Sequence, residues 1–177
     1  MYQLQWYAVR TRSNCEKKVS SLLVEKGIEH YLPTFREVHQ WKDRRKVVEQ
    51  PLFPGYLFTR MMDSRESQLS VLRSDGVVSI LGNRDTIEAV PDSEIEAVRR
   101  LLDSNAGFQA HPLLQEGAWV RVKRGPLKNL EGLLVQIRSQ TRLVVSITLL
   151  SRSVSTQIYA GDVEFLHSAS QRVRRIA

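Results

Sequence analysis

With 177 residues, 42% of them hydrophobic, the chain suits one large or two small domains with ordinary cores. It has no apolar run near the ~20 residues of a membrane span and no basic-then-apolar leader, and its one cysteine allows neither an internal disulfide nor a multi-cysteine zinc cage. We therefore expect a cytoplasmic protein without a membrane anchor, whose net charge of +7 suits either a polyanionic partner or general solubility.

The chain opens with a predicted strand over Leu4–Thr11. Apolar and aromatic side chains alternate along it, and successive residues of a strand point to opposite faces of a sheet. The alternation places Trp6 and Ala8 on one face and Tyr7 and Val9 on the other.

Three helices are predicted in the first 105 residues. Ser13 and Glu16 have the spacing of a capping box, and the helix that they open should stop at Gly27. A short helix is expected over residues 64–72, and a third should begin after Pro91.

Extended segments are predicted between these helices. Residues 28–33, 53–61 and 77–81 read as strands, and residues 38–41 and 46–48 flank an exposed hairpin tip. The order of elements, strand-helix-strand-hairpin-strand-helix-strand-helix, predicts an α+β fold in which helices pack on an antiparallel sheet.

The second part of the chain changes in charge and in pattern. Residues 106–177 hold 10 lysines and arginines against 4 acidic residues, whereas residues 1–105 hold 16 against 15. Weak periodicity over 105–112 indicates a linker, and after it the pattern predicts strands only. The expected strands cover 118–123, 132–139, 142–148, 152–159 and 162–165.

A loop-forming motif joins the first two of these strands. Gly125-Pro126 breaks the first strand, and Leu127 and Leu130 can fold the loop onto a core. This strand-loop-strand unit resembles the KOW motif of small five-stranded barrels. Such barrels occur in ribosomal proteins and in NusG-type elongation factors, so the motif alone does not decide between them.

The stretch Phe53-Pro54-Gly55-Tyr56, which feeds an apolar strand, resembles the central strand of the NusG N-terminal domain. Trp6-Tyr7-x-Val9, Asp75-Gly76-Val77 and Pro91-x-Ser93-x-x-Glu96 agree in order and spacing, so the resemblance covers residues 4–166. Residues 27–33 and 51–58 look most similar to the specialised RfaH and UpxY branch, whereas the C-terminal strands resemble the housekeeping type.

The resemblance implies a domain plan and a function. It implies a polymerase-binding domain over 1–105, a linker over 106–112, a KOW β-barrel over 113–167 and a basic tail over 168–177. A member of this family would be a monomeric transcription elongation factor that suppresses pausing or termination, an antiterminator. The alternative is a ribosome-associated KOW protein that binds RNA.

The resemblance also implies which residues meet RNA polymerase. In the family, an apolar surface of the N-terminal sheet grips the clamp helices of the largest polymerase subunit, and a helix touches the gate loop on the opposite wall of the cleft. Tyr56 and Phe58 match positions of that surface, and their neighbours in sequence or in the sheet are Phe53, Pro54, Trp6 and Tyr7. In a small α+β domain, however, half of these residues must fill the core. The gate-loop positions correspond to Ser67, Gln68 and Ser70.

Basic residues suggest contacts with upstream or non-template DNA. We name the cluster of Lys42, Arg44, Arg45 and Lys46, which lies next to Trp41, the basic tip. Cations and an aromatic ring together can bind phosphates and a base, although charge also keeps an exposed hairpin soluble. Arg10 and Arg12 correspond to positions where RfaH-type proteins meet the non-template strand.

In the predicted barrel, the resemblance implies a surface for the ribosomal protein NusE or the termination factor Rho. The corresponding residues are Leu127, Leu130, Leu149, Leu150 and Arg152. Relatives often carry aromatic residues at some of these positions, so the choice of partner stays open.

Enzyme motifs are absent from the sequence. The 4 histidines lack metal-binding spacings, and no glycine-rich phosphate loop is present. Cys15 shares the apolar face of its predicted helix with Val19 and Leu22, which favours a buried thiol. We expect no enzyme activity, no cofactor and no metal.

Overall fold

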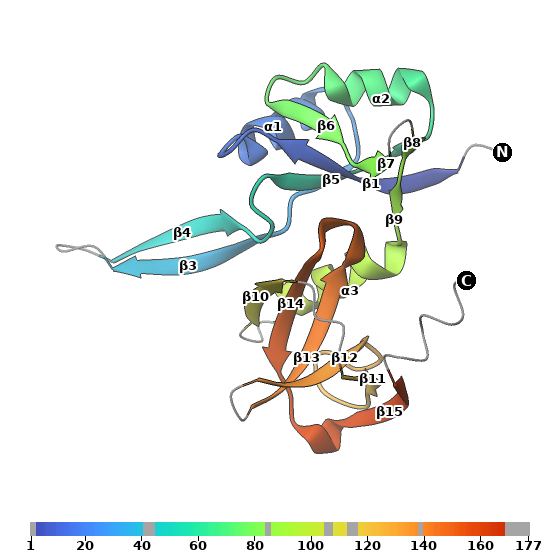
Figure 1. The fold of residues 1–177 in the computed structure, drawn as a ribbon. Coiled ribbons are helices and arrows are strands. Elements are labelled where there is room, and N and C mark those ends of the chain that lie inside the picture. The colour runs from blue at the N-terminus through green and yellow to red at the C-terminus, as the bar shows by residue number, and fades with distance from the viewer. Residues whose placement is uncertain are drawn as a thin grey trace. The chain divides into compact units, whose positions relative to one another are not determined.

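The structure, a computed structural model, describes residues 3–40, 45–83, 86–104, 108–112, 117–137 and 140–168. The chain separates into two compact units, Met1–Asp92 and Ser93–Ala177 (Figure 1). The sequence predicted a first domain that ends at residue 105. The observed division lies earlier, at the start of helix α3 (Asp92–Asp103).

The first unit is built on an antiparallel sheet with the order β2-β5-β1-β6, in which β9 also pairs with β1. Its strands are β1 (Leu4–Thr11), β2 (His30–Tyr31), β5 (Tyr56–Met62), β6 (Val77–Ile80) and β9 (Ala89–Val90). The central pair is β1 and β5; the sequence predicted both strands but not that they pair.

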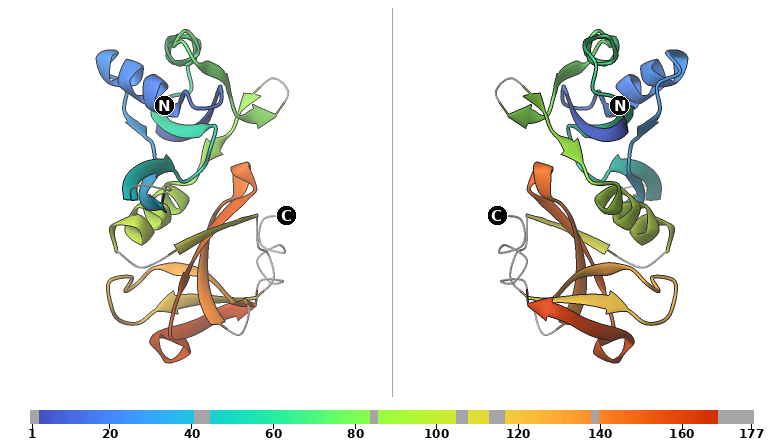
Figure 2. Two further views of the ribbon diagram at one scale, coloured as in Figure 1. Left: turned by 90° about the vertical axis from the view of Figure 1, so that its left-hand side faces the viewer. Right: turned by 90° about the vertical axis from the view of Figure 1, so that its right-hand side faces the viewer.

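Helices α1 (Glu16–Glu25) and α2 (Arg65–Leu72) cover one face of this sheet (Figures 1 and 2). Helix α1 carries Val19 and Leu23 on one helical stripe, and these side chains, with Val71 of α2, pack on alternate residues of β1 and β5. The resulting core contains Tyr7, Val9, Val19, Leu23, Leu57, Met61 and Val71. Together with the sheet, these helices confirm the predicted α+β fold.

Two hairpins extend the first unit. Strands β3 (Thr34–Gln40) and β4 (Arg45–Pro51) pair along their length, as the sequence predicted. A smaller hairpin of β7 (Gly82–Asn83) and β8 (Thr86–Ile87) was not predicted, because two residues per strand are too few to show a period.

The second unit contains a six-stranded antiparallel sheet with the order β10-β14-β13-β12-β11-β15. Five strands match the predicted ones: β11 (Ala118–Val122), β12 (Glu131–Ile137), β13 (Gln140–Ile147), β14 (Arg152–Gln157) and β15 (Val163–Ser168). The sixth, β10 (Phe108–Pro112), lies within the predicted linker and pairs with β14. Backbone pairing with β14 therefore makes residues 108–112 a strand, although their side-chain pattern is too weak to predict one.

Helix α3 has polar contacts with two turns of the second unit. The carboxylate of Glu94 accepts hydrogen bonds from the backbone N–H of Thr148, at 2.9 Å, and from its hydroxyl, at 2.7 Å. The Arg100 guanidinium donates to the carbonyl of Lys128. These contacts account for the grouping of α3 with the C-terminal strands. None of the helices within the described residues is both long and apolar enough to cross a membrane.

Candidate functional site

The sheet of the first unit has a second face, opposite α1 and α2, which we call the aromatic face. It carries Trp6, Ala8, Tyr56, Phe58 and Arg60. The pairing of β1 with β5 sets Ala8 opposite Phe58 and Trp6 opposite Arg60, so residues of two strands meet on this face. Leu57 lies in the core on the other side. This confirms the prediction that Tyr56 and Phe58 share a face that Leu57 does not.

Phe58 is the centre of a ring cluster. Its side chain is fully buried, and the ring of Tyr31 stacks on it with centroids 6.4 Å apart. The ring of Phe53 meets it edge-on, with centroids 6.1 Å apart. Such offset and edge-on pairs are the favoured aromatic geometries. Phe53 and Phe58 are buried, and so is the predicted contact Trp6, at 4% exposed. The half-buried Tyr31 and its neighbour on the face, Tyr56, are therefore the rings that a partner can reach.

Arg60 adds a positive charge to the aromatic face. Its guanidinium carbon lies 6.0 Å from the centroid of the Trp6 ring, a cation–π distance. Its Nη1 lies 3.7 Å from a carboxylate oxygen of Glu29, and its Nε is buried without a hydrogen-bond partner among the described residues. Sequence reasoning missed Arg60 and Tyr31, because their roles depend on which strands are neighbours.

Tyr7 was predicted to contact polymerase, and the structure places it elsewhere. Its side chain is buried in the core under α1 and α2, because it alternates with Trp6 along β1. Its hydroxyl donates to Oε1 of Gln5 at 3.2 Å. Burial, and then the negative charge of Asp63, raises the pKa of Tyr7. Tyr7 therefore stabilises the core and is removed from the candidate surface.

The turn before β5 is held by a carboxylate from α1. Gly55 has a φ of +83°, a conformation that glycine adopts without strain, and its N–H donates to Oε1 of Glu16 at 2.6 Å. The predicted capping box of Ser13 with Glu16 is therefore wrong. The observed N-cap is Cys15, which makes no side-chain cap. Glu16 is buried and positions the turn that carries Phe53.

The predicted gate-loop residues lie on α2, with Ser67 and Gln68 in its first half and Ser70 in its second. The hydroxyl of Ser64 accepts from the N–H of Ser67 at 3.2 Å and donates to the Ser67 hydroxyl at 2.9 Å. The amide of Gln68 donates to Asp63 at 2.8 Å. Two of the three predicted side chains thus serve the start of the helix, while Ser70 is half-buried.

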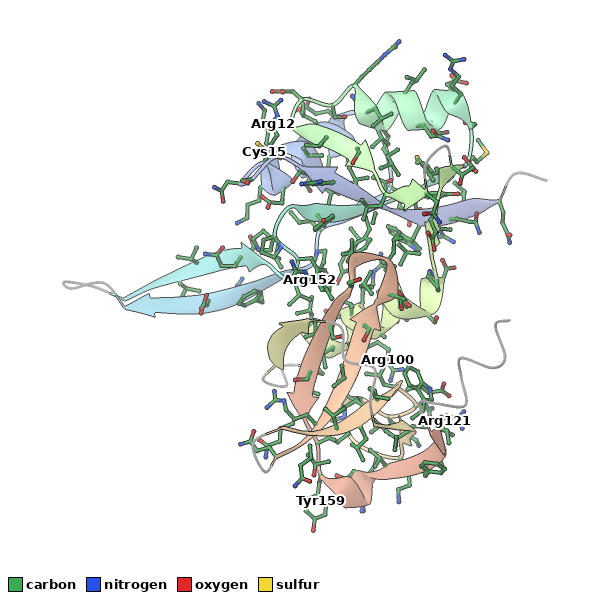
Figure 3. All side chains as sticks on the ribbon, in the orientation of Figure 1. Arg12, Cys15, Arg100, Arg121, Arg152 and Tyr159 are labelled. Carbon is green, nitrogen blue, oxygen red and sulfur yellow. The ribbon has the colours of Figure 1, made fainter. Side chains whose placement is uncertain are left out.

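The predicted nucleic-acid residues divide into two groups. Arg10 is exposed, but Arg12 forms an ion pair with Asp75, which also accepts from Lys18 at 2.6 Å (Figure 3). The hydrogen bond and charge of Lys18, then the charge of Arg12, lower the pKa of Asp75. The basic tip lies outside the described side chains, so its role stays a prediction.

The predicted partner surface of the second unit is largely buried. Leu127, Leu130 and Leu150 are 6%, 4% and 8% exposed. The N–H of Leu130 bonds to the carbonyl of Leu127 at 2.9 Å, which turns the loop inward. These leucines therefore stabilise the fold, as the loop pattern also allowed. Only the half-buried Leu149 and the exposed Arg152 remain available to a partner.

His30 illustrates how the polar side chains of the first unit are used. Its Nε2 lies 2.7 Å from the Ser20 hydroxyl, and its Nδ1 lies 3.1 Å from the Ile28 carbonyl. With both ring nitrogens engaged, His30 joins α1 to β2. Among the described residues, no group of three or more histidines, cysteines and carboxylates is placed to hold a metal.

Comparison with known proteins adds a family to this geometry. The family model NusG, described as transcription termination factor nusG, matches residues 4–99. The Transcription termination/antitermination protein NusG of Rickettsia conorii is 26% identical over 171 residues, covering 90% of this chain and 89% of its own. That of Pseudomonas aeruginosa is 26% identical over 172 residues, covering 90% and 97%.

A solved structure supports the same fold. The structure described as "Domain interaction in Thermotoga maritima NusG" superposes with a TM-score of 0.54 at 21% identity, covering 93% of this chain and 98% of that one. At this identity the likeness concerns the fold alone.

Proposed function

Since the chain belongs to the NusG family of transcription termination and antitermination factors, we propose that it binds RNA polymerase through its aromatic face. In this proposal it acts as an elongation factor that suppresses pausing and termination, and it recruits a partner through its second unit. The single observation that carries the proposal is the ring cluster of Phe53, Phe58 and Tyr31 on the sheet face opposite α1 and α2.

The aromatic face suits a helical partner. Phe53 and Phe58 fix the floor of the cluster, and Tyr56 and Tyr31 offer half-buried rings beside it. Aromatic anchors contribute large contact areas and have few rotors to freeze, so they dominate many interfaces. The clamp helices of the largest polymerase subunit are the partner that family resemblance suggests.

Suppression of pausing needs a second contact on the polymerase. We assign it to α2, whose Ser70 is half-buried and whose Leu69 and Leu72 are 37% and 39% exposed. A protein that holds both walls of the polymerase cleft would favour the closed clamp. In this proposal the aromatic face grips one wall and α2 touches the other, the gate loop.

The second unit is proposed to be a KOW barrel that recruits NusE or Rho. This proposal is supported by five of its strands, which lie close to the ranges that the sequence pattern predicted. Because Leu127, Leu130 and Leu150 are buried, the proposed contact is left to Leu149 and Arg152.

We assign the chain to the specialised RfaH- and UpxY-like branch. The stretches 27–33 and 51–58 support this assignment, and contact of Arg10 and the basic tip with upstream or non-template DNA would suit a factor that acts on particular operons. Genomic position tests this part: a place at the head of a long polysaccharide or secondary-metabolite operon would support it, and a lone housekeeping copy would contradict it.

Copurification tests the main proposal. A tagged full-length chain should travel with core RNA polymerase in a cell extract, and nuclease treatment should leave the association intact, because the proposed face binds protein. Association with ribosomal subunits instead of polymerase would contradict the proposal and support a ribosomal KOW protein.

A further inference from the structure

The second unit presents one unusually exposed aromatic ring. Tyr159 is 76% exposed and precedes the short turn η2 (Ala160–Asp162). Its side chain points away from the body of the unit (Figure 3). A ring of this size usually buries most of its surface, so its exposure here requires a reason.

The turn holds this ring in place. The N–H of Asp162 donates to the carbonyl of Tyr159 at 2.9 Å and closes the turn. A Cβ added to Gly161 would lie 3.1 Å from Cε1 and 3.2 Å from Cδ1 of the Tyr159 ring. The ring therefore lies against the Gly161 backbone, where an added methyl group would force the ring to shift. One face of the ring is supported, and the other is free.

A basic loop is joined to this turn. The loop from Lys123 to Leu130 contains Lys123, Arg124 and Lys128 and no acidic residue. It is joined to the turn at Asp162, whose carbonyl accepts from the Lys123 N–H at 2.7 Å. The Asp162 carboxylate accepts from Arg124 Nε at 2.5 Å.

Two of these cations are free to bind an anion. Arg124 is neutralised by Asp162, but Lys123 and Lys128 are exposed, and neither has an ion-pair partner within the part of the chain that the structure describes. The Tyr159 ring and the two lysines lie on loops that are joined at Asp162, so this surface offers both an aromatic ring and positive charge.

We propose that Tyr159, Lys123 and Lys128 form a binding site for single-stranded nucleic acid. A base stacks on the free face of the Tyr159 ring, and the lysines neutralise flanking phosphates. A duplex would not fit this site, because its bases are already stacked on each other. An acidic peptide would satisfy the lysines but has no planar group for the ring. The site is independent of the proposed polymerase contact.

Fluorescence anisotropy with the full chain tests this site. The probes are a labelled oligouridine RNA and an oligothymidine DNA, measured at several salt concentrations. Replacing Tyr159 by alanine should weaken binding about tenfold, as expected for one lost stacking contact, whereas Tyr159→Phe should keep the affinity. Gly161→Ala should also weaken binding, because the added Cβ displaces the ring without altering any charge. The double change Lys123→Gln and Lys128→Gln should reduce the slope of log K against log salt by roughly 0.7 for each lost phosphate contact.

Phe165→Ala is the matched control, because Phe165 is the other strongly exposed ring of the described second unit, at 64%. Its loss should leave the affinity unchanged. Tighter binding of the RNA probe would identify a transcript as the ligand, and tighter binding of the DNA probe would identify an exposed DNA strand. Unchanged affinity of Tyr159→Ala, equal weakening by Phe165→Ala, or equally strong competition by polyglutamate would overturn the proposal.

Discussion

Replacing Glu16 by alanine should destabilise the first unit through the turn that precedes β5. The Glu16 side chain is 5% exposed, and it accepts the N–H of Gly55 at 2.6 Å. A hydrogen bond to a charged group contributes about 1.5–3 kcal/mol. A carboxylate in the first turn of a helix contributes a further ~0.3–1 kcal/mol. We therefore expect a loss of about 2–4 kcal/mol in the free energy of unfolding.

Urea unfolding of the full chain measures this loss. With a slope of about 1–3 kcal/mol per molar urea, the midpoint of the first unit should fall by roughly 1 M or more. Glu16→Gln keeps an acceptor and should lose less. Glu25→Ala is the matched control, since Glu25 lies at the other end of α1 and is exposed.

The same change should also weaken polymerase binding, because the turn sets the position of the Phe53 ring against Phe58. If Glu16→Ala and Glu25→Ala unfold at the same urea concentration, the carboxylate does not hold the turn, and the reasoning is refuted.

Three further predictions concern charge and packing. Because the pKa of Asp75 is lowered, its ion pairs with Arg12 and Lys18 stabilise the fold above the ordinary aspartate pKa and are lost as the pH falls through the lowered pKa. A carbon-13 NMR titration of the Asp75 carboxylate should therefore give a midpoint below about 3.9. Alanine at all four positions of the basic tip should reduce the salt slope of affinity for a transcription complex by roughly 0.7–0.9 per lost phosphate contact, and an unchanged slope would leave the tip as a solubilising hairpin. Gly132→Ala should destabilise the second unit by about 1–3 kcal/mol, because its Cβ would lie 2.5 Å from the backbone carbonyl oxygen of Val144, and an unaltered melting curve would contradict that packing.

The features that the sequence predicted correctly are those that depend on short-range periodicity. Alternation along β5 predicted that Tyr56 and Phe58 share one face, and the pattern over residues 64–72 predicted the short helix α2. Both follow from local rules that a single segment obeys on its own. The same local reasoning placed the β3–β4 hairpin.

What the sequence could not predict depends on neighbours in space. The stacking of Tyr31 on Phe58 requires β2 to lie beside β5, and the bond of Glu16 to Gly55 joins residues 39 positions apart. Strand β10 owes its place to pairing with β14. Tyr7 was predicted on the polymerase-binding surface because it belongs to the Trp6-Tyr7 motif. Its place in the alternation along β1 instead puts it on the core face.

The buried leucines show a related limit. The resemblance implied partner-binding roles for Leu127 and Leu150, yet both are buried here. A resemblance shows which residues occupy corresponding sequence positions. It does not show whether their side chains are exposed, because exposure depends on how each loop folds.

The central claim is that the aromatic face binds RNA polymerase, and the affinity of a Tyr56→Ala variant for core polymerase free of nucleic acid tests it most directly. Tyr56 is half-buried, so its loss should leave the melting temperature nearly unchanged. Truncating an anchor residue commonly costs about 2 kcal/mol or more, roughly thirtyfold in affinity. The control Phe165→Ala, which removes a ring from the second unit, should bind as the parent does. A Tyr56→Ala variant that binds core polymerase as tightly as the parent would contradict the account.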